Sequence, residues 1–101
     1  MINSEAERMI NKYPERLPII ITKHSSNVKQ SKFLVPREFT IGQLVYIIKR
    51  KSQIKPSEAI FIFTEKNILM NAGSRVEDIY EKHKNKDGFL YLIYSLENTF
   101  G

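Results

Sequence analysis

The chain closes with a short polar segment, residues 97–101, whose last residue is glycine. Because Gly101 has no Cβ, its carboxylate is unhindered and its backbone can adopt conformations that other residues avoid. A tail of this kind can enter a narrow enzyme channel, and proteins that are themselves attached to other molecules end in this way. The chemistry predicted at Gly101 is therefore conjugation, with its carboxyl group as the reacting group and not as a catalyst. The alternative is an ordinary frayed chain end.

Side chains that could catalyse a reaction are scarce. The sequence has no cysteine, which excludes a thiolate nucleophile, a disulfide framework and a thiolate metal site. The two histidines, His24 and His83, fall in a predicted loop and a predicted helix and belong to no recognisable triad. For both histidines, an ordinary surface position is favoured over a shared metal site. We expect no catalytic residue, no metal site and no cofactor, and the chain is predicted not to be an enzyme.

Length and hydropathy predict one small domain. With 101 residues, the chain can bury a single core. No apolar run approaches the roughly 18 residues of a membrane span, and the first residues do not read as a signal peptide. A soluble, cytoplasmic protein is expected. The predicted domain covers 1–101, with 1–14 as an N-terminal helical extension and 95–101 as a flexible conjugation tail.

The net charge of +5 is unevenly distributed. Residues 1–56 hold eleven Lys and Arg against four Asp and Glu, whereas residues 57–101 hold five against seven. This asymmetry favours a basic face for an acidic partner: a nucleic acid, an anionic lipid or an acidic peptide. The alternative is that basic runs such as 49–51 are solvated helix ends.

Two capping boxes predict helix starts, because each places a hydroxyl cap three residues before an acid or amide. They are Ser4 with Glu7, and Thr40 with Gln43. The first helix is expected to end before the following proline. A third, shorter helix is predicted over residues 74–84, with Ser74 in its cap.

The helix predicted over 40–51 has a wide apolar surface. One apolar stripe of this helix consists of Ile41, Leu44, Val45 and Ile48. Tyr46 and Ile47 lie off this stripe. The helix therefore carries more apolar surface than one core contact needs.

Apolar, β-branched and aromatic runs predict strands at 17–23, 32–35, 59–63 and 90–94, with a weak edge strand at 66–70. With the helices, they give the ββαββ order of the ubiquitin-like β-grasp, an α+β fold, preceded here by one helix. In that topology the first and last strands lie side by side and parallel at the sheet centre, which fits their continuously apolar sequences. The second strand lies at an edge and exposes its backbone.

Several segments at these separations resemble one family. They are Ile60–Phe63, Lys86–Tyr91, Glu97–Gly101, Lys32–Pro36, Gly42–Gln43 and Val45–Tyr46. The combination is similar to the autophagy-related eight family of ubiquitin-like modifiers, to which GABARAP belongs. The resemblance runs from about Ser4 to Gly101 with few gaps.

The resemblance implies a fate for the C-terminal glycine. An E1-like enzyme using ATP would activate Gly101, an E2-like enzyme would carry it as a thioester, and an amide with phosphatidylethanolamine would result. A deconjugating cysteine protease would be a further partner. The lipidated protein would lie on autophagosomal or other organelle membranes and recruit autophagy receptors and factors.

The resemblance also implies docking of short motifs of the type aromatic-x-x-aliphatic, by addition of a peptide strand to the edge at residues 32–35. The aromatic pocket would consist of Glu5, Met9, Pro18, Ile20, Lys32, Leu34 and Phe89. The aliphatic pocket would consist of Phe33, Val35, Pro36, Phe39, Leu44 and Ile47. Acidic residues flanking the motif would meet Arg16, Lys32, Lys49 and Lys51.

Each apolar pocket position could instead be plain core packing. For Ile20 and Leu34 the two descriptions are equally favoured, since such residues often serve both roles. For Phe33, Leu44 and Ile47, strand alternation and helical phase predict a place outside the main core, which favours the pocket. The basic side chains could equally be solvated surface groups.

The sequence also departs from the family. Members usually carry two N-terminal helices, and the first is essentially missing here. Gln30 and Ser31 stand where basic residues are usual, so selectivity for acidic flanks is expected to be weaker. Residues 68–73 replace a loop that normally contains a proline pair, and Leu96 replaces a glycine at the start of the tail.

Three alternatives to the lipid-conjugated modifier stay open. One is a soluble adaptor that is not conjugated, and a second is a modifier of another organelle membrane outside bulk autophagy. The third, a small basic nucleic-acid-binding domain, is disfavoured because the strand aromatics do not form an RNA-binding motif and the charge is modest.

Overall fold

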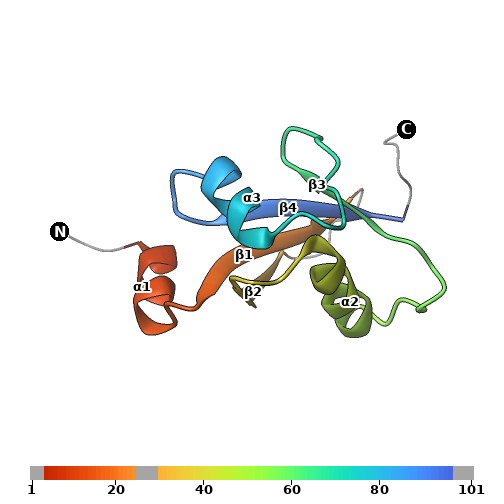
Figure 1. Cartoon of the computed structure of the whole chain (residues 1–101), viewed down its shortest axis with the longest axis horizontal. Helices are drawn as coiled ribbons and strands as arrows, with labels where there is room; N and C mark the ends of the chain where they lie inside the picture. Colours follow the sequence, from red (N-terminus) through yellow and green to blue (C-terminus); the bar gives the residue numbers. More distant parts are fainter. Residues whose placement is uncertain (1–3, 25–29, 97–101) are drawn as a thin grey trace.

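A computed structural model describes residues 4–24 and 30–96 of the chain. Its elements are α1 (Glu5–Lys12), β1 (Arg16–Lys23), β2 (Ser31–Pro36), α2 (Ile41–Lys51), β3 (Phe61–Thr64), α3 (Val76–His83) and β4 (Leu90–Ser95). The four strands form one sheet in the order β2-β1-β4-β3, in which β1 and β4 are parallel and the outer pairs are antiparallel. The ubiquitin-like β-grasp is confirmed, with the first and last strands at the centre and β2 at an edge (Figure 1).

The main core lies between the sheet and the pair α2 and α3. Strand alternation directs Leu17, Ile19 and Ile21 of β1 to this side. They pack with buried residues of both helices, which include Leu44 and Ile79. We call this side of the sheet the α2 face.

A smaller cluster covers the opposite side of the sheet, which we call the α1 face. Ala6 of α1 is fully buried against Ile20 and Phe89, and Met9 and Tyr91 pack around them. Helix α1 therefore covers only part of this face, at the opposite end of the molecule from α2 (Figure 1).

Both predicted capping boxes form. The Ser4 hydroxyl accepts a hydrogen bond from the Glu7 amide at 3.1 Å, and the Glu7 carboxylate accepts one from the Ser4 amide at 3.1 Å. Thr40 and Gln43 make the same reciprocal pair, at 3.3 and 2.8 Å. These starts could be predicted because a capping box depends on four consecutive residues.

The predicted cap of the third helix is wrong. The N-cap residue is Arg75, which makes no side-chain capping bond. The backbone on either side is fixed by α2 and its approach: the Ser74 carbonyl accepts from the Ile41 amide at 2.9 Å, and the Val76 amide donates to the Phe39 carbonyl at 2.8 Å. Tertiary hydrogen bonds, and not a local cap, set where α3 begins.

The edge strand predicted over 66–70 reduces to a single bridge between Phe63 and Leu69. The Thr64 amide donates to the Ile68 carbonyl at 3.0 Å, and the Met70 amide donates to the Ile62 carbonyl at 2.8 Å. The turn before it contains a non-glycine residue, Asn67, with a positive φ of 64°. This sharp turn folds the segment back on β3 for only a few residues.

Candidate functional site

The outer edge of β2 has no strand beside it in the described structure. Its inner edge pairs with β1 so that Leu34 lies opposite Pro18. Because Pro18 has no N–H, this pair cannot exchange two hydrogen bonds, so the bonded pairs must be its neighbours. Those neighbours are Leu17 with Val35 and Ile19 with Phe33. The backbone groups of Lys32 and Leu34 therefore point outward.

One hydrogen bond agrees with this assignment. The Arg16 guanidinium Nη1 donates to the Leu34 carbonyl at 3.3 Å, from the outer side of the strand. The edge thus presents the amides and carbonyls of Lys32 and Leu34, the groups that an added strand would use.

Side chains of β2 alternate between the two faces of the sheet. Val35 belongs to the main core and Phe33 packs against it, so both lie on the α2 face. Lys32 contacts Glu5 of α1 and the Phe89 ring, so Lys32 and, by alternation, Leu34 lie on the α1 face. The two predicted pockets therefore lie on opposite sides of the same edge.

The structure brings together the residues predicted for the aromatic pocket. Ile20 and Phe89 form its buried floor, with exposed fractions of 4% and 5%, and Met9 flanks them. Lys32 and Glu5 form an ion pair at 2.7 Å, with the Lys32 ammonium 5.9 Å from the centroid of the Phe89 ring. Ile20 is both core and pocket floor, so the two descriptions apply together. The Lys32 side chain therefore lies over part of this floor.

The aliphatic pocket is only partly open. Leu44 is fully buried and Val35 is 1% exposed, so the expectation that Leu44 lies outside the main core is wrong. The reason is helical phase, since Leu44 shares the buried stripe of α2 with Ile41 and Ile48. The accessible lining consists of the half-buried residues Phe33, Phe39 and Ile47. Pro36 is also half-buried, but it follows Val35 along β2 and strand alternation places it toward the α1 face.

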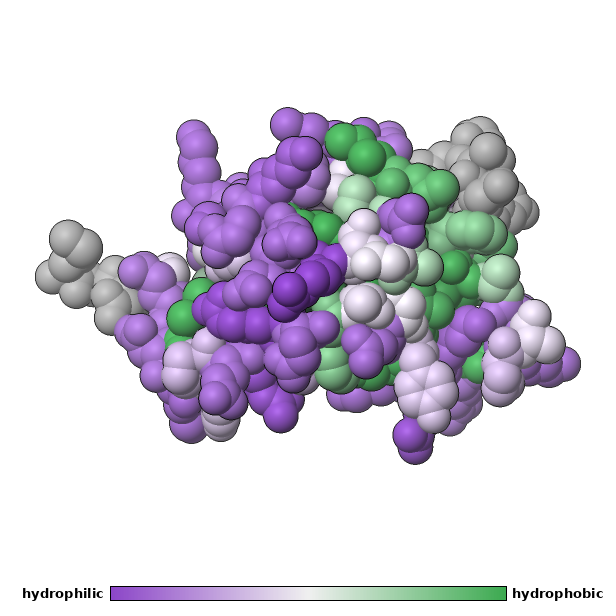
Figure 2. Space-filling model, viewed as in Figure 1, coloured by the Kyte–Doolittle hydropathy of each residue, from purple (hydrophilic) through white to green (hydrophobic). Residues whose placement is uncertain are grey.

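A neighbouring cavity of about 490 Å³ extends this lining along α2. It shares Phe39 and Ile47 with the predicted set and adds Gln43 and Tyr46, whose side chain is 62% exposed. The surplus apolar surface of α2 was the sequence signal for this region. Light green and white side chains gather over this part of the molecule in Figure 2, beside a mostly purple surface at the α1 end.

The basic residues predicted to meet acidic flanks do not all reach the edge. Lys51 lies over the Phe33 ring, with 5.0 Å between its ammonium and the ring centroid, and Arg16 lies over the Leu34 carbonyl. Lys49 instead donates to the Pro56 carbonyl at 3.2 Å, in the loop after α2. The edge itself is therefore lined by Arg16, Lys32 and Lys51.

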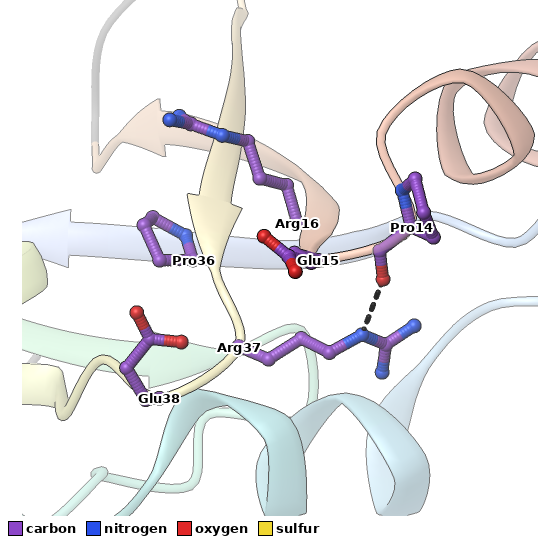
Figure 3. Close-up of a pocket in the computed structure, with 6 residues that line it drawn as sticks. All are labelled: Pro14, Glu15, Arg16, Pro36, Arg37 and Glu38. Carbon is purple, nitrogen blue, oxygen red and sulfur yellow. Dashed lines mark hydrogen bonds between the residues drawn. The ribbon is translucent and has the colours of Figure 1, made fainter.

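A groove of about 410 Å³ lies where β1 begins and β2 ends; we call it the exit groove (Figure 3). Its lining residues are Pro14, Glu15, Arg16, Pro36, Arg37 and Glu38. Arg37 donates through Nε to the Pro14 carbonyl at 2.8 Å and pairs with Glu77 of α3 at 3.2 Å. Arg37 could not be predicted as a lining residue, because nothing in the local sequence indicates that the end of β2 meets both the α1–β1 turn and α3.

The loop before β4 holds Phe89 in place. The Tyr80 hydroxyl donates to the Gly88 carbonyl at 2.5 Å, and the Phe89 amide donates to the Asp87 carboxylate at 2.9 Å. Tyr91 also donates to Asp87, and this hydrogen bond, more than burial, raises the pKa of Tyr91 to about 12. Burial raises the pKa of Tyr80. Both tyrosines therefore remain donors through the neutral pH range.

Gly101, the predicted conjugation site, lies outside the described residues. Across residues 4–24 and 30–96, no helix is long and apolar enough to span a bilayer, and no group of three His, Asp or Glu side chains is placed to hold a metal ion.

Comparisons with known proteins agree with this architecture. The model of the family described as "Autophagy protein Atg8 ubiquitin like" matches residues 2–101. The chain is 44% identical to Autophagy-related protein 8d of Arabidopsis thaliana and 43% identical to Autophagy-related protein 8 of Schizosaccharomyces pombe; each match covers 97% of this chain and 84% of the relative.

A solved structure gives the same result. The crystal structure of Trypanosoma brucei ATG8 superposes with a TM-score of 0.84 at 38% identity, over 96% of this chain and 86% of that one. The sequence, the strand order and the helix arrangement agree, and the chain belongs to the Atg8 family of ubiquitin-like autophagy proteins.

Proposed function

We propose that this protein is a ubiquitin-like modifier that becomes attached through Gly101 to phosphatidylethanolamine and recruits motif-bearing receptors to autophagosomal membranes. The observation that carries the proposal is the family match over residues 2–101, which extends through the terminal glycine. The protein would be cytoplasmic before conjugation and membrane-bound afterwards.

In this reaction the chain supplies only the acyl group. The Gly101 carboxylate would be adenylated by an E1-like enzyme, with ATP as the reagent and pyrophosphate as the leaving group. An enzyme thiol would then displace AMP, and the resulting thioester would pass to an E2-like thiol. Finally the lipid amine would attack the thioester carbonyl and release that thiol. Since the chain has no cysteine, both thiols belong to the partner enzymes.

The recruiting surface would be the outer edge of β2. Residues three apart on an extended peptide point to opposite faces, because side chains alternate with a period of two. An aromatic-x-x-aliphatic motif therefore fits an edge whose pockets lie on opposite faces. Lys32 of the aromatic pocket lies on the α1 face, and Val35 of the aliphatic pocket lies farther along β2 on the α2 face. The peptide would therefore run parallel to β2.

Reconstitution tests the conjugation half of the proposal. The protein would be incubated with matched E1-like and E2-like enzymes, ATP and liposomes containing phosphatidylethanolamine, and its intact mass measured. We expect a mass increase of one lipid that Gly101→Ala reduces at least about tenfold, because the added Cβ obstructs a channel shaped for glycine.

The control is omission of ATP, which should abolish the product of the wild-type chain. Full lipid conjugation of the Gly101→Ala variant would contradict the mechanism. Motif binding without any lipidated form would favour the soluble adaptor, since the β2 edge does not depend on Gly101.

A further inference from the structure

Arg37 links the turn between α1 and β1 to α3. Its backbone amide donates to the Glu15 carbonyl at 3.1 Å, and its Nε donates to the Pro14 carbonyl at 2.8 Å, so both groups hold this turn. Figure 3 shows the side chain extending from the end of β2 to Pro14. Its Nη1 also donates to the Glu77 carboxylate of α3 at 3.2 Å. The turn after α1 is therefore braced from a neighbouring element.

The bond from Arg37 to Glu77 is better shielded than the exposed ion pairs of the protein. The side chains of Arg37 and Glu77 are 32% and 36% exposed, whereas Arg75, which reaches the other oxygen of Glu77 at 3.8 Å, is 55% exposed. A planar guanidinium can hold a carbonyl and a carboxylate at the same time, and charge-assisted bonds of this kind are stronger than neutral ones. Arg37 is therefore a firm brace for the turn.

The braced turn leads directly out of α1, which has few other attachments. The Tyr13 amide closes the helix by donating to the Met9 carbonyl at 2.8 Å. Ala6, in the first turn, is the fully buried side chain of α1, whereas Met9 and Ile10 are half-buried. A short helix with so little buried surface is weakly held by packing. The position of its last turn therefore depends on the bond from Arg37 to Pro14.

Helix α1 supplies one wall of the aromatic pocket. The floor, Ile20 and Phe89, belongs to the sheet side of the small cluster, and Met9 packs beside it from α1. Met9 lies one helical turn before Tyr13, the residue that joins α1 to the braced turn. Because the floor and the wall belong to different elements, the distance between them depends on how the end of α1 is held.

Resting on the docking function proposed above, we propose that Arg37 is a positioning residue that determines which aromatic side chain the motif can use. A wall held close to the floor contacts a phenyl ring from both sides. A wall that moves away leaves the phenyl ring with the floor alone, whereas the larger indole of a tryptophan still reaches both surfaces. Arg37 therefore favours motifs with the smaller ring, through α1 and not by contact with the peptide.

The test uses two motif peptides that differ only at the aromatic residue, Trp in one and Phe in the other. Titration calorimetry would measure both against the full chain and its Arg37→Ala variant. We expect the ratio of the Trp affinity to the Phe affinity to rise about three- to tenfold in the variant, because the smaller ring loses its second contact surface. A general loss of structure would weaken both peptides and leave this ratio unchanged.

Arg75→Ala is the matched control, because Arg75 also pairs with Glu77 but makes no bond to the α1–β1 turn within residues 4–24 and 30–96. It should leave the affinity ratio at the wild-type value. Hydrogen exchange gives a second measurement, in which Arg37→Ala should speed the exchange of the α1 amides and leave those of β4 unchanged.

The outcomes separate the two proposals. If the wild type binds both peptides and Arg37→Ala leaves their affinity ratio unchanged, the role of Arg37 is overturned and the docking function stands. An equal change of the ratio in Arg75→Ala would also overturn it, since charge near Glu77 would then be the cause. Failure of both peptides to bind the wild type would overturn the docking function and, with it, the selection of the ring.

Discussion

At the scale of single residues, Gly88 has a conformation and a position that other residues could not share. Its φ is +89°, and a Cβ built on it would lie 2.9 Å from the Cβ of Ala6 in α1. Ala6 is itself fully buried. The absence of a side chain at Gly88 therefore lets α1 pack onto the sheet where it flanks the aromatic pocket.

Gly88→Ala should lower the free energy of unfolding by about 1 to 3 kcal/mol, through backbone strain and the clash with Ala6. Denaturant unfolding measures the change. Gly73→Ala is the control, because its new Cβ would meet only an ordinary contact with Asn71 at 3.5 Å, and we expect a change within about 0.5 kcal/mol. Equal effects of the two substitutions would contradict the packing described for α1.

At the scale of elements, the starts of α1 and α2 could be predicted because their caps are local. The start of α3 could not, because its first turn depends on hydrogen bonds to α2 and to the segment before it. The burial of Leu44 was missed because helical phase was taken to leave it outside the main core, although it shares one stripe of α2 with the buried residues Ile41 and Ile48. Arg37 gave no signal at all, because its partners Pro14 and Glu77 meet it only in the folded chain.

This difference between α2 and α3 predicts two unequal substitutions. Thr40→Ala should cost about 1 kcal/mol of unfolding free energy, because the amide of Gln43 loses its acceptor. Ser74→Ala should cost less than about 0.5 kcal/mol, since its side chain caps nothing. Chemical denaturation of the two variants in parallel checks the ranking, and a larger loss for Ser74→Ala would restore the cap expected from the sequence.

At the scale of the whole molecule, the proposed reacting end and the proposed docking edge belong to different strands. The proposed conjugation tail follows β4 in the sequence, whereas the edge belongs to β2, and β1 lies between these two strands in the sheet. The fold could be predicted from strand order and apolar patterning. How far each pocket is open to solvent could not be predicted, because it depends on which side chains are buried in the core clusters on the α2 face and the α1 face.

Because these two regions are separate, a substitution in one should impair its function without affecting the other. Ile47→Asp should weaken motif binding at least about tenfold, because it places a carboxylate in the apolar lining of the aliphatic pocket, while the rate of lipid conjugation stays near that of the wild type. Ile68→Asp is the matched control, at an isoleucine that is 46% exposed near the opposite edge of the sheet, and it should leave motif affinity unchanged. Loss of lipid conjugation in a folded Ile47→Asp protein would show that the two functions share a surface.

The sheet order has a consequence for stoichiometry. Among residues 4–24 and 30–96, the outer side of β3 is partly closed by the bridge to Leu69, whereas the outer side of β2 is open, so the proposed docking would give each molecule a valency of one toward an added strand. A receptor with a single motif then gains nothing from a crowded membrane beyond its intrinsic affinity. A receptor with two motifs engages two neighbouring copies, and its second binding step depends on their surface density and on the spacer between its motifs. Avidity would then make membrane capture respond steeply to the number of conjugated molecules.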